Sequence, residues 1–167
     1  FRSIRENRTY DQVLGDMSQG NGDPTLTLFG AGITPNAHGL SQSFVLFDNF
    51  YVDADVSYDG HSFATAAYAT DFTQKMWQGI SSRGGPALGQ GGSGLRNAFG
   101  NITAPAGGYI WDVARRAKLS VRSYGEFVLN TKGPNGALTS VSEGVPGLKG
   151  AIAPGFAGFD MTITDVS

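Results

Sequence analysis

A carboxylate and an amide stand side by side near the start of the chain, at Glu6 and Asn7. Both side chains offer oxygen ligands, which hard divalent cations such as Ca, Mg, Mn or Fe ions accept in proteins. We therefore expect Glu6 and Asn7 to supply part of a divalent metal site. A dipeptide is an unspecific signal, and the flanking Arg5 and Arg8 could simply pair with nearby carboxylates at the surface.

A second dense cluster of polar residues, 53–61, surrounds Ser57. Ser57 lies between an apolar run and a helical stretch, where backbone N–H groups and the helix dipole favour a bound phosphate. A serine is a poor nucleophile unless a base or a metal activates it, and a cation at Glu6 and Asn7 would do so. Alternatively, Ser57 serves only as a helix cap and His61 only as a structural hydrogen-bonding residue.

Tyr124, Gly125 and Glu126 follow an apolar stretch that we expect to be a strand. Glu126 would then reach the same edge of a sheet as Ser57, and Tyr124 and Glu126 become candidates for substrate binding. A structural role for Glu126 is the alternative. His38 is expected to be a surface or packing residue of its helix.

The elements that must position these residues alternate between strand and helix. A nearly continuous apolar run at 44–52 is typical of a strand buried on both faces. The expected order is a strand ending near residue 5, a helix at 9–16, a helix at 34–43, a strand at 44–52, a helix at 58–72, a Gly-rich loop at 79–108, a helix at 109–117, a strand at 119–124 and a loop at 130–147. This order predicts an α/β fold with a mainly parallel sheet, in which ligands bind beyond the carboxyl ends of the strands.

Composition excludes several classes of protein. The chain has 167 residues, enough for one domain, with 40% hydrophobic and 16% charged residues. Its net charge is −2 and no basic stripe stands out, which argues against nucleic acid as a partner. No apolar run is long enough to predict a membrane span. The absence of cysteine excludes disulfides and a thiolate nucleophile.

Many ordered segments resemble the bacterial phosphoesterase family. That family contains phospholipase C-like enzymes and acid phosphatases and belongs to the alkaline phosphatase superfamily. The resemblance begins with Glu6-Asn7-Arg8-Thr9-Tyr10-Asp11 and includes Val56-Ser57-Tyr58-Asp59-Gly60-His61. The matching segments are residues 6–16, 20–24, 34–38, 44–51, 56–61, 66–71, 108–112, 124–126 and 158–160.

The resemblance implies a metal-dependent hydrolase of phosphoric esters with a three-layer α/β/α sandwich fold. By this resemblance Glu6 and Asn7 are metal ligands, and Ser57 is the nucleophile and a bridge to the metal. Asp59 and His61 would support the phosphate site. A bacterial enzyme of this kind is expected in the periplasm or outside the cell, and the start at Phe1 suggests that an upstream piece was removed.

The chain departs from the family pattern in length. The family's catalytic domain is much longer, and its later acidic and histidine motifs have no counterpart here. Ala151 follows Gly150 where a histidine is expected. We therefore interpret residues 1–167 as the amino-terminal part of a catalytic domain, completed by a missing C-terminal portion or a second chain and nearly inactive alone. The alternative is a non-catalytic fragment or degenerate homologue with a structural or assembly role.

Overall fold

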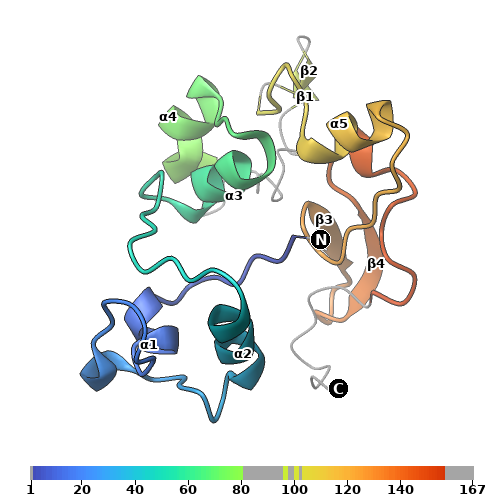
Figure 1. Cartoon of the computed structure of the whole chain (residues 1–167). Helices are drawn as coiled ribbons and strands as arrows, with labels where there is room; N and C mark the ends of the chain where they lie inside the picture. Colours follow the sequence, from blue (N-terminus) through green and yellow to red (C-terminus); the bar gives the residue numbers. More distant parts are fainter. Residues whose placement is uncertain (1, 81–95, 98–99, 102, 157–167) are drawn as a thin grey trace. The chain divides into compact units, whose positions relative to one another are not determined.

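The computed structural model describes residues 2–80, 96–97, 100–101 and 103–156. The chain divides into two compact units, Phe1–Val52, drawn in blue to cyan in Figure 1, and Asp53–Ser167. No helix in the described part of the chain is long and apolar enough to cross a membrane.

The first unit contains α1 (Tyr10–Leu14), the 3-10 helix η1 (Pro24–Leu26) and α2 (Pro35–Ser43). A capping box starts α1, because Thr9 accepts a hydrogen bond from the Gln12 N–H while the Gln12 side chain accepts one from the Thr9 N–H. Thr34 occupies the N-cap position of α2 and Pro35 its first turn, as the sequence predicts. The Thr34 hydroxyl does not cap the helix; it donates to the Phe29 carbonyl oxygen at 2.8 Å.

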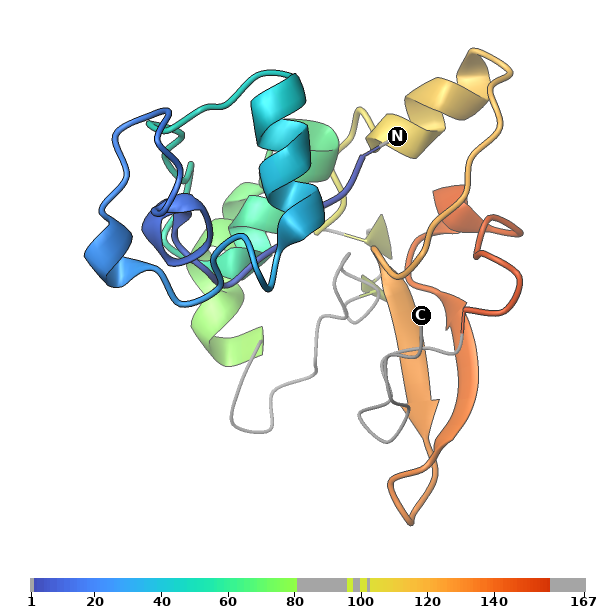
Figure 2. The same ribbon diagram turned by 60° about the horizontal axis from the view of Figure 1, so that its bottom comes forward.

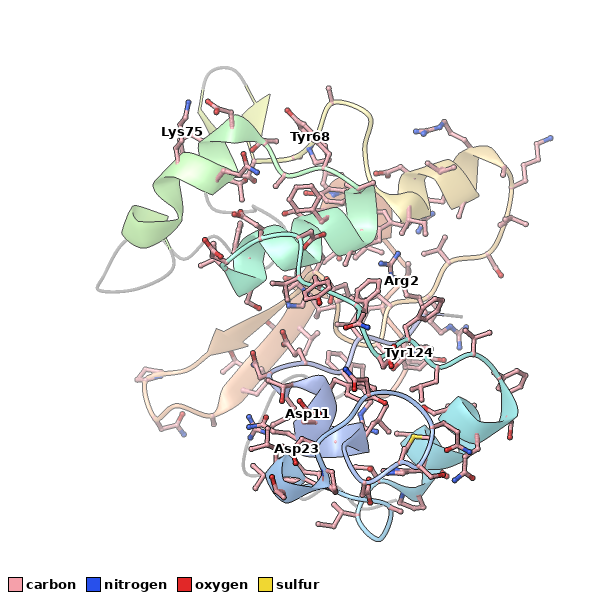
Figure 3. All side chains as sticks on the ribbon, turned by 60° about the vertical axis from the view of Figure 1, so that its left-hand side comes forward. Arg2, Asp11, Asp23, Tyr68, Lys75 and Tyr124 are labelled. Atoms are coloured by element: carbon pink, nitrogen blue, oxygen red, sulfur yellow. The ribbon has the colours of Figure 1, made fainter. Side chains whose placement is uncertain are left out.

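Carboxylates hold the loops of the first unit. Asp11 accepts a hydrogen bond from the Asp23 N–H at 2.8 Å, and these two labelled side chains lie close together in Figure 3. Asp48 likewise accepts from the Asn21 N–H at 2.8 Å. Since Met17 is the buried apolar side chain among the described residues of this unit, these bonds carry much of its organisation.

The second unit carries the longer helices, namely α3 (Ser57–Ala66), α4 (Asp71–Ile80) and α5 (Ile110–Arg116). α3 ends at Ala67, whose φ of 54° lies in the left-handed region. Thr70 starts the next helix, because its hydroxyl accepts a hydrogen bond from the Thr73 N–H. The sequence predicts one helix over 58–72, and the left-handed turn at Ala67 divides that stretch into two helices.

Two antiparallel strand pairs belong to the second unit. β1 (Arg96–Asn97) pairs with β2 (Gly100–Asn101), and β3 (Val128–Lys132) pairs with β4 (Leu138–Glu143). The β3–β4 hairpin is seen as a two-stranded ribbon in Figure 2. Its turn has Gly136 at a φ of 79°, with the Gly136 N–H bonded to the Gly133 carbonyl oxygen. A left-handed residue after such a turn produces a bulge, which explains the register shift between Thr131 and Lys132.

The core of the second unit is built around three aromatic rings. Tyr109 and Trp111 are stacked with centroids 4.7 Å apart, and Phe127 meets both rings edge-on. The remaining buried members of this cluster are Val145, Leu148, at the end of the 3-10 helix η2 (Pro146–Leu148), and Ala151. This core fixes the chain on either side of β3 and β4, including the residues just before Phe127.

The predicted strand at 44–52 is wrong, because the structure has no strand there. Leu46 is half-buried, and the other apolar side chains of that run are exposed, from 70% at Phe47 to 86% at Phe50. The predicted strand at 119–124 is reduced to one parallel bridge between Ser123 and Ile152. The predicted loop at 130–147 contains most of the β3–β4 hairpin instead.

Most of the predicted Gly-rich loop lies outside the described residues, which begin again at β1. The first two positions of that loop, Gly79 and Ile80, belong to α4. The strand pairs that the structure describes are antiparallel. The three-layer α/β/α sandwich with a mainly parallel sheet stays a prediction.

Candidate functional site

Two predicted site residues from distant parts of the sequence meet in the second unit. The His61 Nδ1 atom lies 2.9 Å from the Glu126 Oε1 atom, although the residues are 65 positions apart. The His61 side chain is 9% exposed and the Glu126 side chain 26% exposed. A hydrogen bond between a buried imidazole and a carboxylate fixes the ring's orientation and tautomer, which is how histidine is prepared for proton transfer.

The backbone around Glu126 is held on both sides. Before it, the Ser123 hydroxyl donates to the Glu126 carbonyl oxygen at 2.7 Å. After it, the Phe127 ring lies in the core at 1% exposure. Gly125 and Phe127 have φ values of 131° and 56°, so the chain turns sharply through Glu126. The position of this carboxylate is therefore set by the core and not by a flexible loop.

Ser57 is the first residue of α3, one helical turn before His61. The N-cap position belongs to Val56, which offers no side-chain cap, so the interpretation of Ser57 as a simple cap does not hold. Side chains four residues apart on a helix are neighbours, with Cβ atoms about 5–6 Å apart, and each leans toward the helix N-terminus. Ser57 is exposed at the start of this helix.

Asp59 is a buried carboxyl in the first turn of the same helix. The residue is 5% exposed, and its Oδ1 atom has no hydrogen-bond partner. Burial raises the pKa of Asp59 above its ordinary value, and the negative charge of Asp53 raises it further. Asp59 is therefore easier to protonate than an ordinary aspartate.

Glu6 and Asn7 belong to the first unit and are exposed. Asn7 has a φ of 65°, a conformation that asparagine tolerates better than most residues. Arg8 donates a hydrogen bond to the Asn7 carbonyl oxygen at 2.5 Å, and its guanidinium lies over the Phe29 ring. Because Ser57 lies in the other unit, the metal site that links it to Glu6 and Asn7 stays a prediction.

Among the described residues, no group of three or more His, Cys, Asp or Glu side chains is arranged to hold a metal ion. Tyr124, the other substrate-binding candidate, is 67% exposed and comes two residues before Glu126. Ala151, at the position where a histidine was expected, lies in the core, and its carbonyl oxygen accepts a hydrogen bond from the Ser123 N–H. That position therefore supports the turn that carries Glu126.

A pair in the first unit, formed by the buried His38 and the more exposed Asp16, is not indicated by the sequence. The His38 Nε2 atom lies 2.7 Å from Asp16 Oδ1, and its Nδ1 atom lies 2.9 Å from the Thr34 carbonyl oxygen. Since both ring nitrogens face acceptors, the site favours the doubly protonated ring. The bond to Asp16 is the main cause of the raised pKa of His38, and the same bond lowers the pKa of Asp16. No spacing rule joins residues 16 and 38.

Comparisons of the chain with protein-family models, with curated protein sequences and with solved structures find no match. The hydrogen bond between His61 and Glu126 brings together two candidate site residues that lie far apart in the sequence.

Proposed function

We propose that this chain is the amino-terminal part of a metal-dependent phosphoric ester hydrolase, of the phosphatase or phospholipase C-like kind found in the bacterial phosphoesterase family. Ser57 is the nucleophile. The single observation that carries the proposal is the 2.9 Å hydrogen bond between His61 and Glu126, one helical turn from Ser57. The sequence resemblance at 6–16 and 56–61 supplies the reaction class.

In the proposed reaction the Ser57 Oγ atom attacks the phosphorus of a phosphate ester and the alcohol leaves. His61, held by Glu126, takes the Ser57 proton and passes it to the leaving oxygen, and it later takes a proton from the attacking water. Water then attacks the phosphoserine, which releases phosphate and restores Ser57. The positive end of the α3 dipole favours the charged phosphoryl group.

The oxygen donors of Glu6 and Asn7 fit a hard divalent cation, and Ca, Mg, Mn and Fe ions are all compatible with them. When bound beside Ser57, such an ion supplies positive charge that activates the serine and offsets charge on the phosphoryl oxygens. Two or three ligands hold a divalent cation weakly. We therefore expect the remaining ligands to come from a C-terminal portion or a second chain. We also expect the protein to be periplasmic or extracellular.

The test is hydrolysis of an aryl phosphate by the full-length protein with added divalent metal. Ser57→Ala should abolish turnover, because no nucleophile remains. The matched control is Ser140→Ala, which removes an exposed serine of β4 and should leave turnover unchanged. Equal turnover in the two variants would remove Ser57 from the mechanism.

The alternative is a structural or assembly role without catalysis, and one observation favours it. The apolar side chains of 44–52 that the structure leaves exposed are Phe44, Val45, Phe47, Phe50, Tyr51 and Val52. Exposed apolar stretches of this kind mark contact surfaces. This role predicts that the protein forms an oligomer in light scattering and that the oligomer dissociates when Phe47 and Phe50 are both changed to serine. It also predicts that the protein does not hydrolyse phosphate esters.

A further inference from the structure

We propose that Asn21 is a site of spontaneous deamidation in the folded protein, whereas a second Asn–Gly pair, Asn135–Gly136, is protected by its turn. Asparagine stands directly before glycine at these two positions of the sequence. Asn21 and Gly22 lie between α1 and η1 in the first unit, and Asn135–Gly136 lies between β3 and β4 in the second (Figure 1). The modification needs no part of the proposed hydrolase.

An Asn–Gly pair contains both the nucleophile and the leaving group of this reaction. The backbone nitrogen of the glycine attacks the side-chain Cγ atom of the asparagine, a C–N bond forms, and the side-chain amide leaves as ammonia with the proton of the backbone N–H. Water then opens the succinimide ring at either carbonyl and gives aspartate or isoaspartate. Glycine favours the attack because no Cβ atom hinders the approach of the two groups.

Hydrogen bonds occupy both reacting groups of the pair in the hairpin. The Gly136 N–H donates to the Gly133 carbonyl oxygen at 2.9 Å, and the Asn135 Oδ1 atom accepts from the Ala137 N–H at 3.1 Å. The Gly133 N–H also donates to the Ala137 carbonyl oxygen at 2.9 Å, directly beside the paired strands β3 and β4. The Gly136 nitrogen can therefore attack only when this end of the hairpin opens.

The reacting groups of the pair in the first unit are not held in this way. In the part of the chain that the structure describes, the Asn21 side chain and the Gly22 N–H make no hydrogen bond. Asn21 is exposed, so water and hydroxide ions reach its side-chain amide. Attack at Asn21 therefore requires only rotation about the bonds of these two residues, whereas attack at Asn135 requires the hairpin turn to open.

Conversion of Asn21 changes a loop that is fixed on both sides. The Asn21 N–H donates to the Asp48 Oδ2 atom at 2.8 Å. The Asp23 N–H donates to the Asp11 Oδ1 atom at 2.8 Å. Between these bonds Gly22 has little room, because a Cβ atom at this position would lie 2.9 Å from the nearest backbone atom. Isoaspartate inserts one methylene group into the backbone here and should therefore break one of the two bonds.

The test follows the intact, folded chain in a mildly alkaline buffer, with samples digested for mass spectrometry over time. We expect the peptide that contains Asn21 to convert at least about tenfold faster than the peptide that contains Asn135. In urea, where both pairs are unfolded, the two peptides should convert at similar rates. Equal or faster conversion at Asn135 in the folded chain, or conversion of Asn21 in urea alone, would overturn the proposal.

Matched variants assign the change to single residues. Asn21→Gln would need a less favourable six-membered ring, so the folded variant should gain no negative charge in anion-exchange chromatography, whereas Asn135→Gln should gain charge as fast as the wild type. Pro134→Gly loosens the turn and should speed conversion of Asn135 several-fold without changing Asn21. Gain of charge by Asn21→Gln at the wild-type rate, or an unchanged rate at Asn135 in Pro134→Gly, would contradict the assignment.

A last comparison separates the new charge from the longer backbone. Asn21→Asp adds the charge alone and keeps the N–H that donates to Asp48. The converted wild-type chain is purified by anion exchange, and an isoaspartyl methyltransferase verifies that it contains isoaspartate. Its Tm, followed by circular dichroism, should be lower than the Tm of Asn21→Asp, because a loop hydrogen bond is lost. The same Tm for both chains would contradict that loss.

Discussion

Four of the described aspartates differ in what their oxygens bind. Asp11, Asp16 and Asp48 in the first unit each accept a hydrogen bond from a backbone N–H and hold a loop. Asp59 in the second unit has an oxygen without a hydrogen-bond partner, although the residue is buried. A buried unpaired oxygen destabilises the folded state, and such costs concentrate at functional sites. The contrast separates structural carboxylates from the one beside Ser57.

The pair formed by Asp16 and His38 predicts how the stability of the first unit depends on pH. The folded pKa of His38 is raised, so its contribution is complete below the unfolded value, about 6.5, and is lost as pH rises through the folded pKa. The folded pKa of Asp16 is lowered, so its contribution is present above the unfolded value, about 3.9, and is lost as pH falls through the folded pKa.

We therefore expect the Tm of unfolding to fall as the pH rises above about 6.5, the unfolded pKa of His38. In His38→Gln, which lacks the titrating ring, the Tm should already be lower at about pH 6 and change less with pH. Thermal unfolding followed by circular dichroism measures both. A wild-type protein and a His38→Gln variant with the same pH dependence would remove the pair from the stability of this unit.

At the scale of elements, the sequence predicts helix starts well and strands poorly. Thr9 with Gln12 and Thr34 with Pro35 are local signals, and the structure confirms α1 and α2. Strand pairing depends on distant partners, so the apolar run at 44–52 could not reveal that it is exposed and unpaired in the structure. The sequence predicts a loop over 130–147 because the segment is rich in turn formers, and the structure shows that the turn at 133–136 joins the paired strands β3 and β4.

The left-handed residue Ala67, which ends α3, gives a prediction about the stability of the second unit. Ala67 is exposed and left-handed, a conformation that costs an alanine about 1 kcal/mol and a glycine almost nothing. Ala67→Gly should therefore stabilise the second unit by about 0.5–1 kcal/mol. The control is Ala64→Gly in the interior of α3, which should destabilise it by about 1 kcal/mol. Urea unfolding measures both values, and destabilisation in both variants would contradict a left-handed helix end at Ala67.

At the scale of the whole molecule, the candidate site residues belong to two different units of the chain. The sequence identifies His61 and Glu126 separately, and the structure joins them through contacts that no local pattern shows. Glu6 and Asn7 lie in the other unit, and their link to Ser57 rests on the resemblance alone. A mutation of Glu6 or Asn7 therefore tests whether the proposed hydrolase depends on a metal bound by these residues.

Asn7 allows that test because its side-chain oxygen can be removed without changing the conformation of its backbone. Asn7→Gly keeps the left-handed conformation and removes the amide oxygen, whereas Asn7→Asp keeps an oxygen ligand. In the full-length protein we expect Asn7→Gly to raise the metal concentration for half-maximal phosphate ester turnover by at least about tenfold. Asn7→Asp should change it much less. The same metal dependence in both variants would show that Asn7 is not a ligand.

Direct trapping of the covalent intermediate tests the central claim, that Ser57 is the nucleophile toward phosphate esters. The full-length protein is mixed with an aryl phosphate and divalent metal, quenched in acid during turnover and digested for mass spectrometry. We predict one phosphoryl group on Ser57, absent in Ser57→Ala and longer-lived in His61→Gln, where water lacks its base. Sustained turnover with Ser57 unmodified, or with phosphate on another residue, would contradict the proposal.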